Sequence, residues 1–284
     1  MEVAVADGSR SDSAAVGAAL LHDRYRAPLD LPASGSDVIE TLLSHRSVRA
    51  YLPDAVPPGT IELLIAAAQS APTSSNLQPW SVVAVEDPAR KARLAALAGD
   101  QRQILQAPLF LLWIVDHHRL ARNGARQDVP SDGLHFLESF LLGAVDTALA
   151  AQNAVVALES LGLGGCYIGG IRNRPVEVAA ELGLPPRTFA LFGLTVGYPD
   201  PGAPASVKPR LPQEAVLFRE RYGADDDAPA VAAYDRRLRT FQCEQGMPER
   251  DWSEQAAQRV RGADALAGRH LLRTALNRLG FHLA

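Results

Sequence analysis

A short basic segment, His45-Arg46-Ser47-Val48-Arg49, places two guanidinium groups, an imidazole and a hydroxyl within five residues. The planar fork of arginine matches the oxygens of a phosphate, so donors at this spacing could bind one anion. The segment also follows the end of a predicted helix, where the helix dipole favours cations. The residues alone leave two interpretations open, a phosphate site and a solvated helix end. For a short motif the second is the more common outcome.

A second pair of cations flanks a proline at Lys208-Pro209-Arg210. The chain uses arginine almost throughout, and its only lysines are Lys91 and Lys208. An ammonium group and a guanidinium on one rigid turn can bind the same phosphate. The motif therefore favours an anion-binding clamp, with a surface loop as the alternative.

Residues 71–80, APTSSNLQPW, form a run of hydroxyl and amide side chains between a predicted helix and a predicted strand. Such small donors and acceptors could bind the polar edge of a heteroaromatic ring. An ordinary polar turn has the same composition. Taken alone, the run favours the turn.

Residues 164–173, GGCYIGGIRN, contain two glycine pairs. Without side chains, the backbone at Gly169-Gly170 can approach a flat ligand and offer its N–H groups. A simple strand-to-helix turn would explain the glycines equally well. Cys166 has no histidine near it in sequence, which favours a packed thiol over a nucleophile.

Several common catalytic motifs are absent from the sequence: it has no G-x-S-x-G elbow, H-E-x-x-H, paired C-x-x-C or P-loop lysine motif. Hydrolase, zinc-enzyme and NTPase chemistry therefore have no support. What remains is a set of phosphate-binding cations, ring-binding polar groups and backbone donors. Such a set is typical of a site in which a cofactor carries the chemistry.

The elements that must position these groups can be predicted from hydrophobic periodicity. Helices are expected from residue 37, over 60–70, 88–98, 134–161 and 175–182, and after Pro212. Strands are expected over 81–85, 109–115, 164–170 and 189–198. No G-x-G-x-x-G follows a strand and few βαβ units are consecutive, so a Rossmann fold is disfavoured. We expect an α+β fold, a mixed sheet surrounded by helices.

The chain is expected to have three parts. Residues 1–36 are predicted to be a loosely ordered extension with a short helix near 18–24, residues 37–212 the core, and residues 213–284 a helical tail. The polar stretch 117–133 is predicted to be a mobile loop.

Composition limits the class of protein. The 284 residues are 47% hydrophobic and carry a net charge of −4, which suits a globular core and disfavours nucleic acid as a partner. Two cysteines are too few for a disulfide framework. No signal peptide is apparent, and the apolar stretch 140–158 contains Asp146, Gln152 and Asn153, which disfavours a membrane span. We expect a cytoplasmic protein without membrane or nucleic-acid partners.

In their order and spacing, the motifs HRSVR, SSNLQPW, YIGGIRN and VKPRLP resemble the larger, NADPH-preferring nitroreductase and FMN reductase family. The resemblance runs from about Asp37 to the C-terminus. It implies a nitroreductase-like fold, an intertwined homodimer whose tail helices pack on the partner subunit, and FMN as cofactor. The implied reaction is ping-pong: NADPH or NADH reduces FMN, and a small-molecule acceptor such as a nitroaromatic, a quinone or free flavin then takes the electrons. A flavin reductase that serves a monooxygenase and a non-catalytic flavin-binding protein are the alternatives.

The resemblance also implies roles for individual residues. The FMN phosphate would be held by His45, Arg46, Ser47, Lys208 and Arg210. Arg49 would lie against the pyrimidine edge of the ring and stabilise negative charge there. The rest of the ring would be contacted by Thr73, Gln101, Tyr167, Ile168, Gly169 and Gly170.

The tail departs from the family pattern. Members often carry an arginine before a glycine, where it binds the extra phosphate of NADPH, and the corresponding pair here is Gln245-Gly246. Arg172 and Arg250 are the candidates to replace that arginine. The preference for NADPH over NADH is left open.

Overall fold

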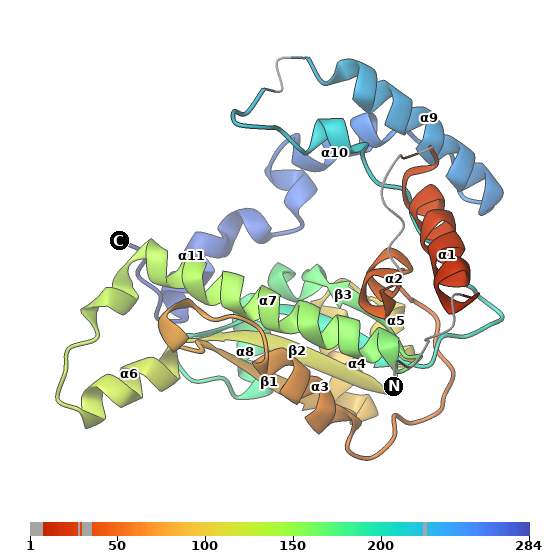
Figure 1. Ribbon diagram of the computed structural model, residues 1–284. Helices are drawn as coiled ribbons and strands as arrows, with labels where there is room; N and C mark the ends of the chain where they lie inside the picture. The colour runs from red at the N-terminus through yellow and green to blue at the C-terminus, as the bar shows by residue number, and fades with distance from the viewer. Residues whose placement is uncertain (1–7, 28, 30–35, 224–225) are drawn as a thin grey trace, which may run out of the picture. The chain divides into compact units, whose positions relative to one another are not determined.

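The computed structural model describes residues 8–27, 29, 36–223 and 226–284 (Figure 1). The backbone divides into two compact units. The larger unit comprises Ser47–Pro204 and Leu266–Ala284, and the smaller comprises Met1–Arg46 and Ala205–Ala265. Most of the linker in the predicted extension, residues 30–35, lies outside the described residues, as do residues 1–7. The three-part division of the chain stays a prediction.

The larger unit is built on a sheet whose described strands are β1 (Trp80–Val85), β2 (Leu109–Asp116), β3 (Gly164–Ile168) and β4 (Thr188–Gly197). Their order in the sheet is β1-β2-β4-β3, and each of the three pairings is antiparallel. The register places Trp80 opposite Val115 and Gly164 opposite Gly197. The predicted α+β class is confirmed, and all four strands occur where the apolar runs predicted them. The expected mixture of parallel and antiparallel pairs is not seen among the described strands, because each of their three pairings is antiparallel.

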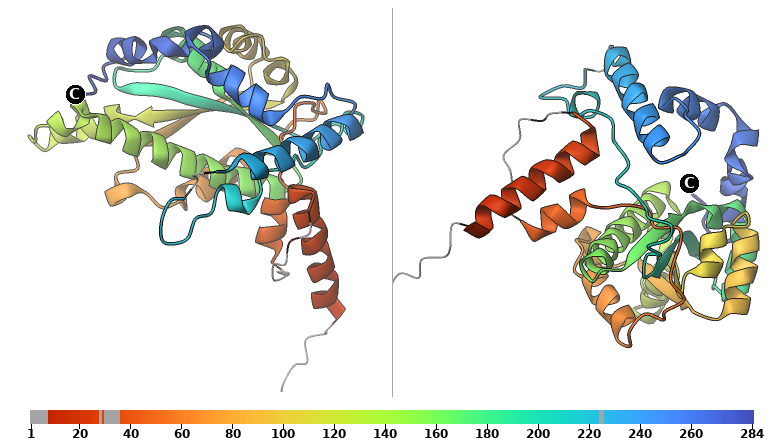
Figure 2. Two further views of the ribbon diagram at one scale, coloured as in Figure 1. Left: turned by 90° about the horizontal axis from the view of Figure 1, so that it is seen from above. Right: turned by 90° about the vertical axis from the view of Figure 1, so that its right-hand side faces the viewer.

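Helices cover both faces of this sheet (Figure 2, left). Alternate residues of β2 show the two layers, because side chains on a strand point to opposite faces in turn. Leu109 and Trp113 pack with α3 (Thr60–Gln69) and α7 (Leu137–Ser160), and Phe110 packs with α4 (Pro88–Leu97) and α8 (Pro175–Leu182). All eight residues of β2 are buried, as its continuous apolar run predicted.

The remaining described elements of the larger unit are short. They are α5 (Arg102–Gln106), α6 (His117–Arg126), α11 (Leu272–Arg278), η1 (Ser74–Asn76), η2 (Asp132–His135), η3 (Gly169–Asn173) and η6 (Arg269–Leu271). The glycine pair of the predicted 164–170 strand therefore begins a 3-10 turn, because β3 ends at Ile168.

The prediction of a mobile loop over 117–133 is wrong. Residues His117–Arg126 form α6, and Asp116 caps it by accepting a hydrogen bond from Arg119 N at 3.0 Å. The Arg119 guanidinium donates to the carbonyl oxygens of Gln78 and Trp80, both at 3.1 Å. The helix has little apolar surface to reveal it in the sequence. Its cap and the contacts of one arginine hold it in place.

Helix α7 is long and apolar enough to cross a membrane, judged by length and composition. One face, with residues such as Ala150 and Leu158, is buried in the core of the larger unit, and the buried carboxylate of Asp146 bonds to a neighbouring loop. These contacts identify α7 as a core helix. Its other face carries a stripe of exposed apolar side chains, Leu137, Leu141, Val145 and Leu149.

The smaller unit contains α1 (Gly8–Tyr25), α2 (Asp37–Leu43), η4 (Gln213–Ala215), α9 (Ala228–Glu244) and α10 (Trp252–Val260), and η5 (Ala263–Leu266) follows α10. Tyr234, Leu238 and Phe241 of α9 form its apolar cluster, and the Trp252 ring lies 5.8 Å from that of Tyr234. Helix α1 is longer than the short helix expected near residues 18–24. The helix predicted from residue 37 is confirmed as α2.

The buried imidazole of His117 should make stability depend on pH. Its Nε2 bonds to the Ser139 carbonyl oxygen at 3.0 Å, and its ring packs on Phe281. Burial lowers the pKa of His117 below its ordinary value of 6.5; the bond to Ser139 and the charge of Asp116 oppose this shift, whereas Arg187 adds to it. The unfolded chain therefore binds the extra proton first as the pH falls. The contribution of His117 is complete above pH 6.5 and is lost as the pH falls toward the lower pKa of the folded state.

The measurement is urea unfolding of the wild type and of His117→Gln, which keeps a side-chain donor but cannot titrate. The difference in unfolding free energy between the two should be constant above pH 6.5 and should shift in favour of the variant below it. A difference that does not change between pH values on either side of 6.5 would contradict this assignment.

Candidate functional site

An open pocket of about 350 Å³ lies in the larger unit where the predicted YIGGIRN segment meets α7. Its lining residues are Ala148, Gln152, Tyr167, Gly169, Arg172 and Phe192. The Tyr167 and Phe192 rings meet edge to face, with centroids 5.0 Å apart. Burial raises the pKa of Tyr167, so its phenol stays protonated and can donate. Residues from a helix, two strands and a 3-10 turn thus form one aromatic, partly polar recess.

Gly169 and Gly170, beside this pocket, differ in the space that a side chain would have. A Cβ on Gly170 would lie 2.3 Å from the Ala98 carbonyl oxygen, so no other residue fits without moving the backbone. A Cβ on Gly169 would meet only flexible arginine ends, the nearest at 3.2 Å. Gly170 therefore has a packing role, and Gly169, which lines the pocket, leaves the backbone accessible.

The close approach at Gly170 also brings the loop after α4 next to the turn. Gln101 immediately precedes α5, and its Oε1 accepts a hydrogen bond from the Gln103 side-chain amide at 2.8 Å. Gly99 in the same loop has Asn173 of the 3-10 turn as its nearest neighbour. The structure thus brings the loop of Gln101 to the element that carries Gly169 and Gly170.

The polar loop after α3 is held by a buried carboxylate. Asp146 of α7 is 3% exposed and accepts hydrogen bonds from Thr73 Oγ1 at 2.6 Å and from Ser74 N at 3.2 Å. Thr73 Oγ1 in turn accepts from Gln78 N at 3.0 Å. Ser75, at φ 49°, and Gln78, at φ 50°, adopt the left-handed conformation that non-glycine residues avoid. Backbone strain of this kind is typical of ligand-binding loops.

The segment after Arg46 runs beside the sheet. Val48 N donates to the Gly165 carbonyl oxygen at 3.0 Å, and Tyr51 OH donates to the Val48 carbonyl oxygen at 2.6 Å. These bonds place Ser47 and Arg49 next to β3. Burial raises the pKa of the Cys166 thiol, which the charge of Arg49 partly offsets. Cys166 is accordingly a packed thiol, as predicted.

The other predicted phosphate ligands lie in the smaller unit, at the end of α2 and after residue 204. The guanidinium of Arg46 bonds to the Ser44 carbonyl oxygen at 3.3 Å, and that of Arg210 to the Lys208 carbonyl oxygen at 3.0 Å. Within the described chain, neither arginine forms an ion pair, and both are exposed. We call the group His45, Arg46, Lys208 and Arg210 the basic cluster. The other lysine, Lys91, has a structural role, since its Nζ donates to the Ala107 carbonyl oxygen at 2.6 Å.

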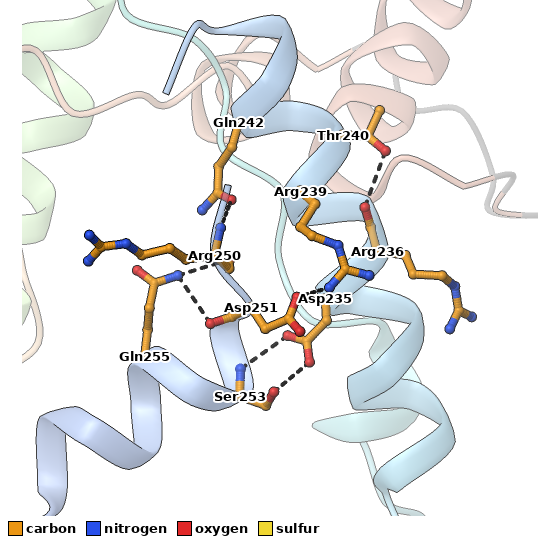
Figure 3. A network of polar contacts seen from close by, with 9 residues as sticks. All are labelled: Asp235, Arg236, Arg239, Thr240, Gln242, Arg250, Asp251, Ser253 and Gln255. Atoms are coloured by element: carbon orange, nitrogen blue, oxygen red, sulfur yellow. Dashed lines mark hydrogen bonds and ion pairs between the residues drawn. The ribbon is translucent and has the colours of Figure 1, made fainter. Parts of the chain in front are cut away.

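Of the two nucleotide candidates, Arg172 lines the pocket and donates to the Leu191 carbonyl oxygen. Arg250 belongs to a polar network between α9 and α10 (Figure 3). Its backbone N donates to Gln242 Oε1 at 2.7 Å, and its guanidinium points away from the network. Gln245, at the position where an arginine was expected, accepts a hydrogen bond from Ser206.

Comparison with protein families decides the classification. A model described as the nitroreductase family matches residues 42–198, and a model of the C-terminal domain of the same family matches residues 208–284. The chain belongs to the nitroreductase family. The resemblance inferred from the four motifs is confirmed, and each candidate residue lies within a matched range. Helix α1 precedes the matched residues.

Curated relatives give the same answer over most of the chain. An FMN reductase (NADPH) of Bacillus subtilis is 37% identical over 227 residues, which cover 78% of this chain and 90% of the relative. An oxygen-insensitive NADPH nitroreductase of Salmonella typhimurium is 39% identical over 221 residues, 77% of this chain and 89% of the relative.

Solved structures agree in fold. The NfrA1 nitroreductase from B. subtilis has a TM-score of 0.81 at 34% identity, covering 87% of this chain and 99% of its own. The NADPH:FMN oxidoreductase from Vibrio harveyi, complexed with NAD⁺, has a TM-score of 0.76 at 35% identity, with the same coverage. The nitroreductase-like fold predicted for this chain is confirmed.

Two residues that support the candidate site are not among those predicted from the sequence. Asp146 appeared only as a polar residue within an apolar helix, and its partners lie more than 70 positions away. Arg24 lies in the predicted extension, and its side chain contacts the backbone of His45 and Lys208. Neither residue carries a local motif, so only the fold reveals them.

Removing the Asp146 carboxylate should destabilise this loop. In Asp146→Leu two donors lose their acceptor, and hydrogen bonds to a charged group contribute about 1.5–3 kcal/mol each. We expect a loss of roughly 2–4 kcal/mol in unfolding free energy, with faster amide hydrogen exchange over residues 73–78. Asp146→Asn, which keeps one acceptor, should lose less.

Glu138→Leu is the matched control, since it removes an exposed carboxylate from the same helix. Its effect should stay within about 0.5 kcal/mol. Equal effects at positions 138 and 146 would show that the loop does not depend on the buried carboxylate.

Proposed function

We propose that this chain is an FMN-dependent NAD(P)H oxidoreductase that reduces small-molecule acceptors. One observation carries the proposal. The pocket lined by Tyr167, Gly169 and Arg172 is formed by the segment that the sequence predicts to contact the flavin ring. The named relatives, an FMN reductase and an NADPH nitroreductase among them, support the same cofactor and donor.

The donor set fits the FMN phosphate. None of the five side chains carries a carboxylate, and together they supply cations and hydrogen-bond donors at neutral pH: His45, Arg46, Ser47, Lys208 and Arg210. The hydroxyl of Ser47 and the imidazole of His45 can also accept a hydrogen bond. Within the described residues, Arg46 and Arg210 bond to carbonyl oxygens and pair with no carboxylate. A dianionic phosphate would neutralise such a cluster. We assign these five residues to the phosphate.

Two of the residues predicted to contact the ring, Tyr167 and Gly169, line the pocket. Arg49, at the edge of β3, would bind the pyrimidine edge and stabilise negative charge there. The ring contacts would come from Thr73, Gln101, Tyr167, Ile168, Gly169 and Gly170. Bound FMN would supply the redox chemistry that couples oxidation of NAD(P)H to reduction of the acceptor. The protein would position the flavin and the nicotinamide, and the hydrogen bond from Thr73 to Asp146 holds the loop of Thr73 in place.

The nicotinamide donor would be NADPH or NADH. Arg172 and Arg250 are the proposed contacts to the nucleotide, because one lines the pocket and the other has a guanidinium that points away from its network. Gln245 supplies no positive charge for the extra phosphate of NADPH. The ratio of kcat/KM for the two nicotinamides would measure that discrimination.

The chain is further proposed to act as a cytoplasmic homodimer whose tail helices pack on the partner. The stripe Leu137, Leu141, Val145 and Leu149 on α7 repeats every fourth residue and is 41% to 55% exposed. A continuous apolar stripe on a helix favours burial against another surface. Sedimentation equilibrium should give twice the 30.4 kDa of one chain.

Steady-state kinetics separates this function from its alternatives. A nitroreductase retains FMN and reduces nitroaromatics or quinones with NAD(P)H at rates that added FMN does not raise. A flavin reductase serving a monooxygenase would instead turn over added FMN rapidly. A flavin-binding protein without catalysis would not oxidise either nicotinamide in the presence of any acceptor.

A further inference from the structure

One buried side chain near the end of α1 contacts both segments of the basic cluster. Arg24 Nη2 donates to the carbonyl oxygens of Leu43 at 2.7 Å and His45 at 2.8 Å. Its Nη1 donates to the carbonyl oxygen of Lys208 at 3.1 Å. The residue is only 7% exposed. A planar guanidinium has donors in fixed directions, so it can hold several carbonyl groups at set positions.

The backbone of Arg24 forms a further hydrogen bond to the basic cluster. Its carbonyl oxygen accepts a hydrogen bond from Arg210 N at 2.9 Å. Arg24 thus contacts three of the four residues of the basic cluster, His45, Lys208 and Arg210, and each contact is to their backbone. His45 is more than 160 positions from Lys208 and Arg210 in the sequence, and α1 lies before the residues that match the family.

Other residues at this end of α1 attach the helix through partners on α9 and η4. Arg26 forms an ion pair with Glu244 at 2.7 Å and lies over the Phe241 ring, 5.7 Å from its centroid. Tyr25 OH accepts a hydrogen bond from Gln213 at 3.5 Å. Arg26 is therefore a matched control, because it helps to dock the same helix end through different partners.

We infer that Arg24 is a positioning residue for the FMN phosphate. It joins the two segments that carry the phosphate ligands, so that their side chains are set before the cofactor arrives. Preorganisation of this kind raises affinity because less order has to be gained on binding. The inference rests on the proposed function, and it gives the N-terminal helix a role in cofactor retention.

Riboflavin, which has the same ring as FMN but no phosphate, separates positioning from general stability. The apoprotein is titrated with FMN and with riboflavin, and binding is followed by quenching of flavin fluorescence. The variants are Arg24→Met, Arg24→Lys and the control Arg26→Met. We expect Arg24→Met to weaken FMN binding by roughly 10- to 100-fold, as for the loss of one charge-assisted contact, and riboflavin binding by less than about twofold. Arg24→Lys, which keeps the charge and fewer directed donors, should be intermediate.

Arg26→Met should leave both affinities within about twofold of the wild type. Equal weakening of FMN and riboflavin binding by Arg24→Met would overturn the inference. So would an Arg26→Met variant that loses affinity for FMN but not for riboflavin to the same extent as Arg24→Met. If Arg24→Met does not fold, the ratio of FMN affinity to riboflavin affinity is measured in Arg24→Lys instead. A ratio equal to that of the wild type would contradict the inference. A wild-type protein without affinity for FMN would instead contradict the proposed function.

Discussion

Replacing Arg46 and Lys208 together with alanine is expected to strip the protein of its flavin. Both residues belong to the basic cluster and, by our assignment, bind the FMN phosphate. Charge-assisted hydrogen bonds contribute about 1.5–3 kcal/mol each, so the loss of two should weaken FMN binding by roughly 10²- to 10⁴-fold. Both side chains are exposed, and the fold should persist. The measurement is the FMN content of the purified variant, together with its circular dichroism and melting temperature.

The matched control removes the same two charges elsewhere in the smaller unit. Arg219 and Arg236 are exposed, and their replacement by alanine changes the net charge equally. The control variant should retain wild-type flavin. If the Arg46 and Lys208 variant also retains it, or if both variants lose it to the same extent, the assignment of the phosphate ligands is wrong.

Removing the charge of Arg49 is expected to make the bound flavin harder to reduce. Arg49 lies beside β3, and its positive charge would stabilise the negative charge that the ring gains on reduction. A hydrogen bond to a charged group contributes about 1.5–3 kcal/mol, and 30 mV corresponds to about 1.4 kcal/mol for a two-electron couple. In Arg49→Met the potential should fall by about 30–60 mV, and hydride transfer should slow by roughly tenfold.

Arg49→Lys is the control for this second prediction, because it keeps the charge while losing the planar fork. Its potential should stay within about 10 mV of the wild type. The potentials are measured by equilibration with redox dyes, using protein saturated with FMN. An Arg49→Met variant that binds FMN at an unchanged potential would remove Arg49 from the ring site.

The elements predicted from the sequence are those whose burial follows a simple period. β2 is buried on both faces and appears as a continuous apolar run, and α8 begins at Pro175, where a proline suits the first turn of a helix. Helix α6 escaped prediction because it has little apolar surface, with His117 as its one buried residue, and because the contacts of Arg119 with Gln78 and Trp80 are tertiary features. Short α5, with one buried residue, Ile104, offers too little periodicity.

Some residues of the candidate site could likewise be predicted from the sequence, and others could not. Arg46, Tyr167 and Lys208 could be named in advance because their motifs are local in sequence. Asp146 and Arg24 could not, because each acts through hydrogen bonds to residues far along the chain. A buried polar residue on an apolar helix indicates that a partner exists, but the sequence does not identify which loop supplies it.

Anaerobic titration of the purified protein with NADPH and with NADH tests the central claim most directly. We expect a yellow protein whose flavin absorbance is bleached by at least one nicotinamide at one equivalent per bound FMN, and restored when a nitroaromatic or a quinone is added. A protein that cannot be loaded with FMN, or whose bound FMN stays oxidised with both nicotinamides, would contradict it.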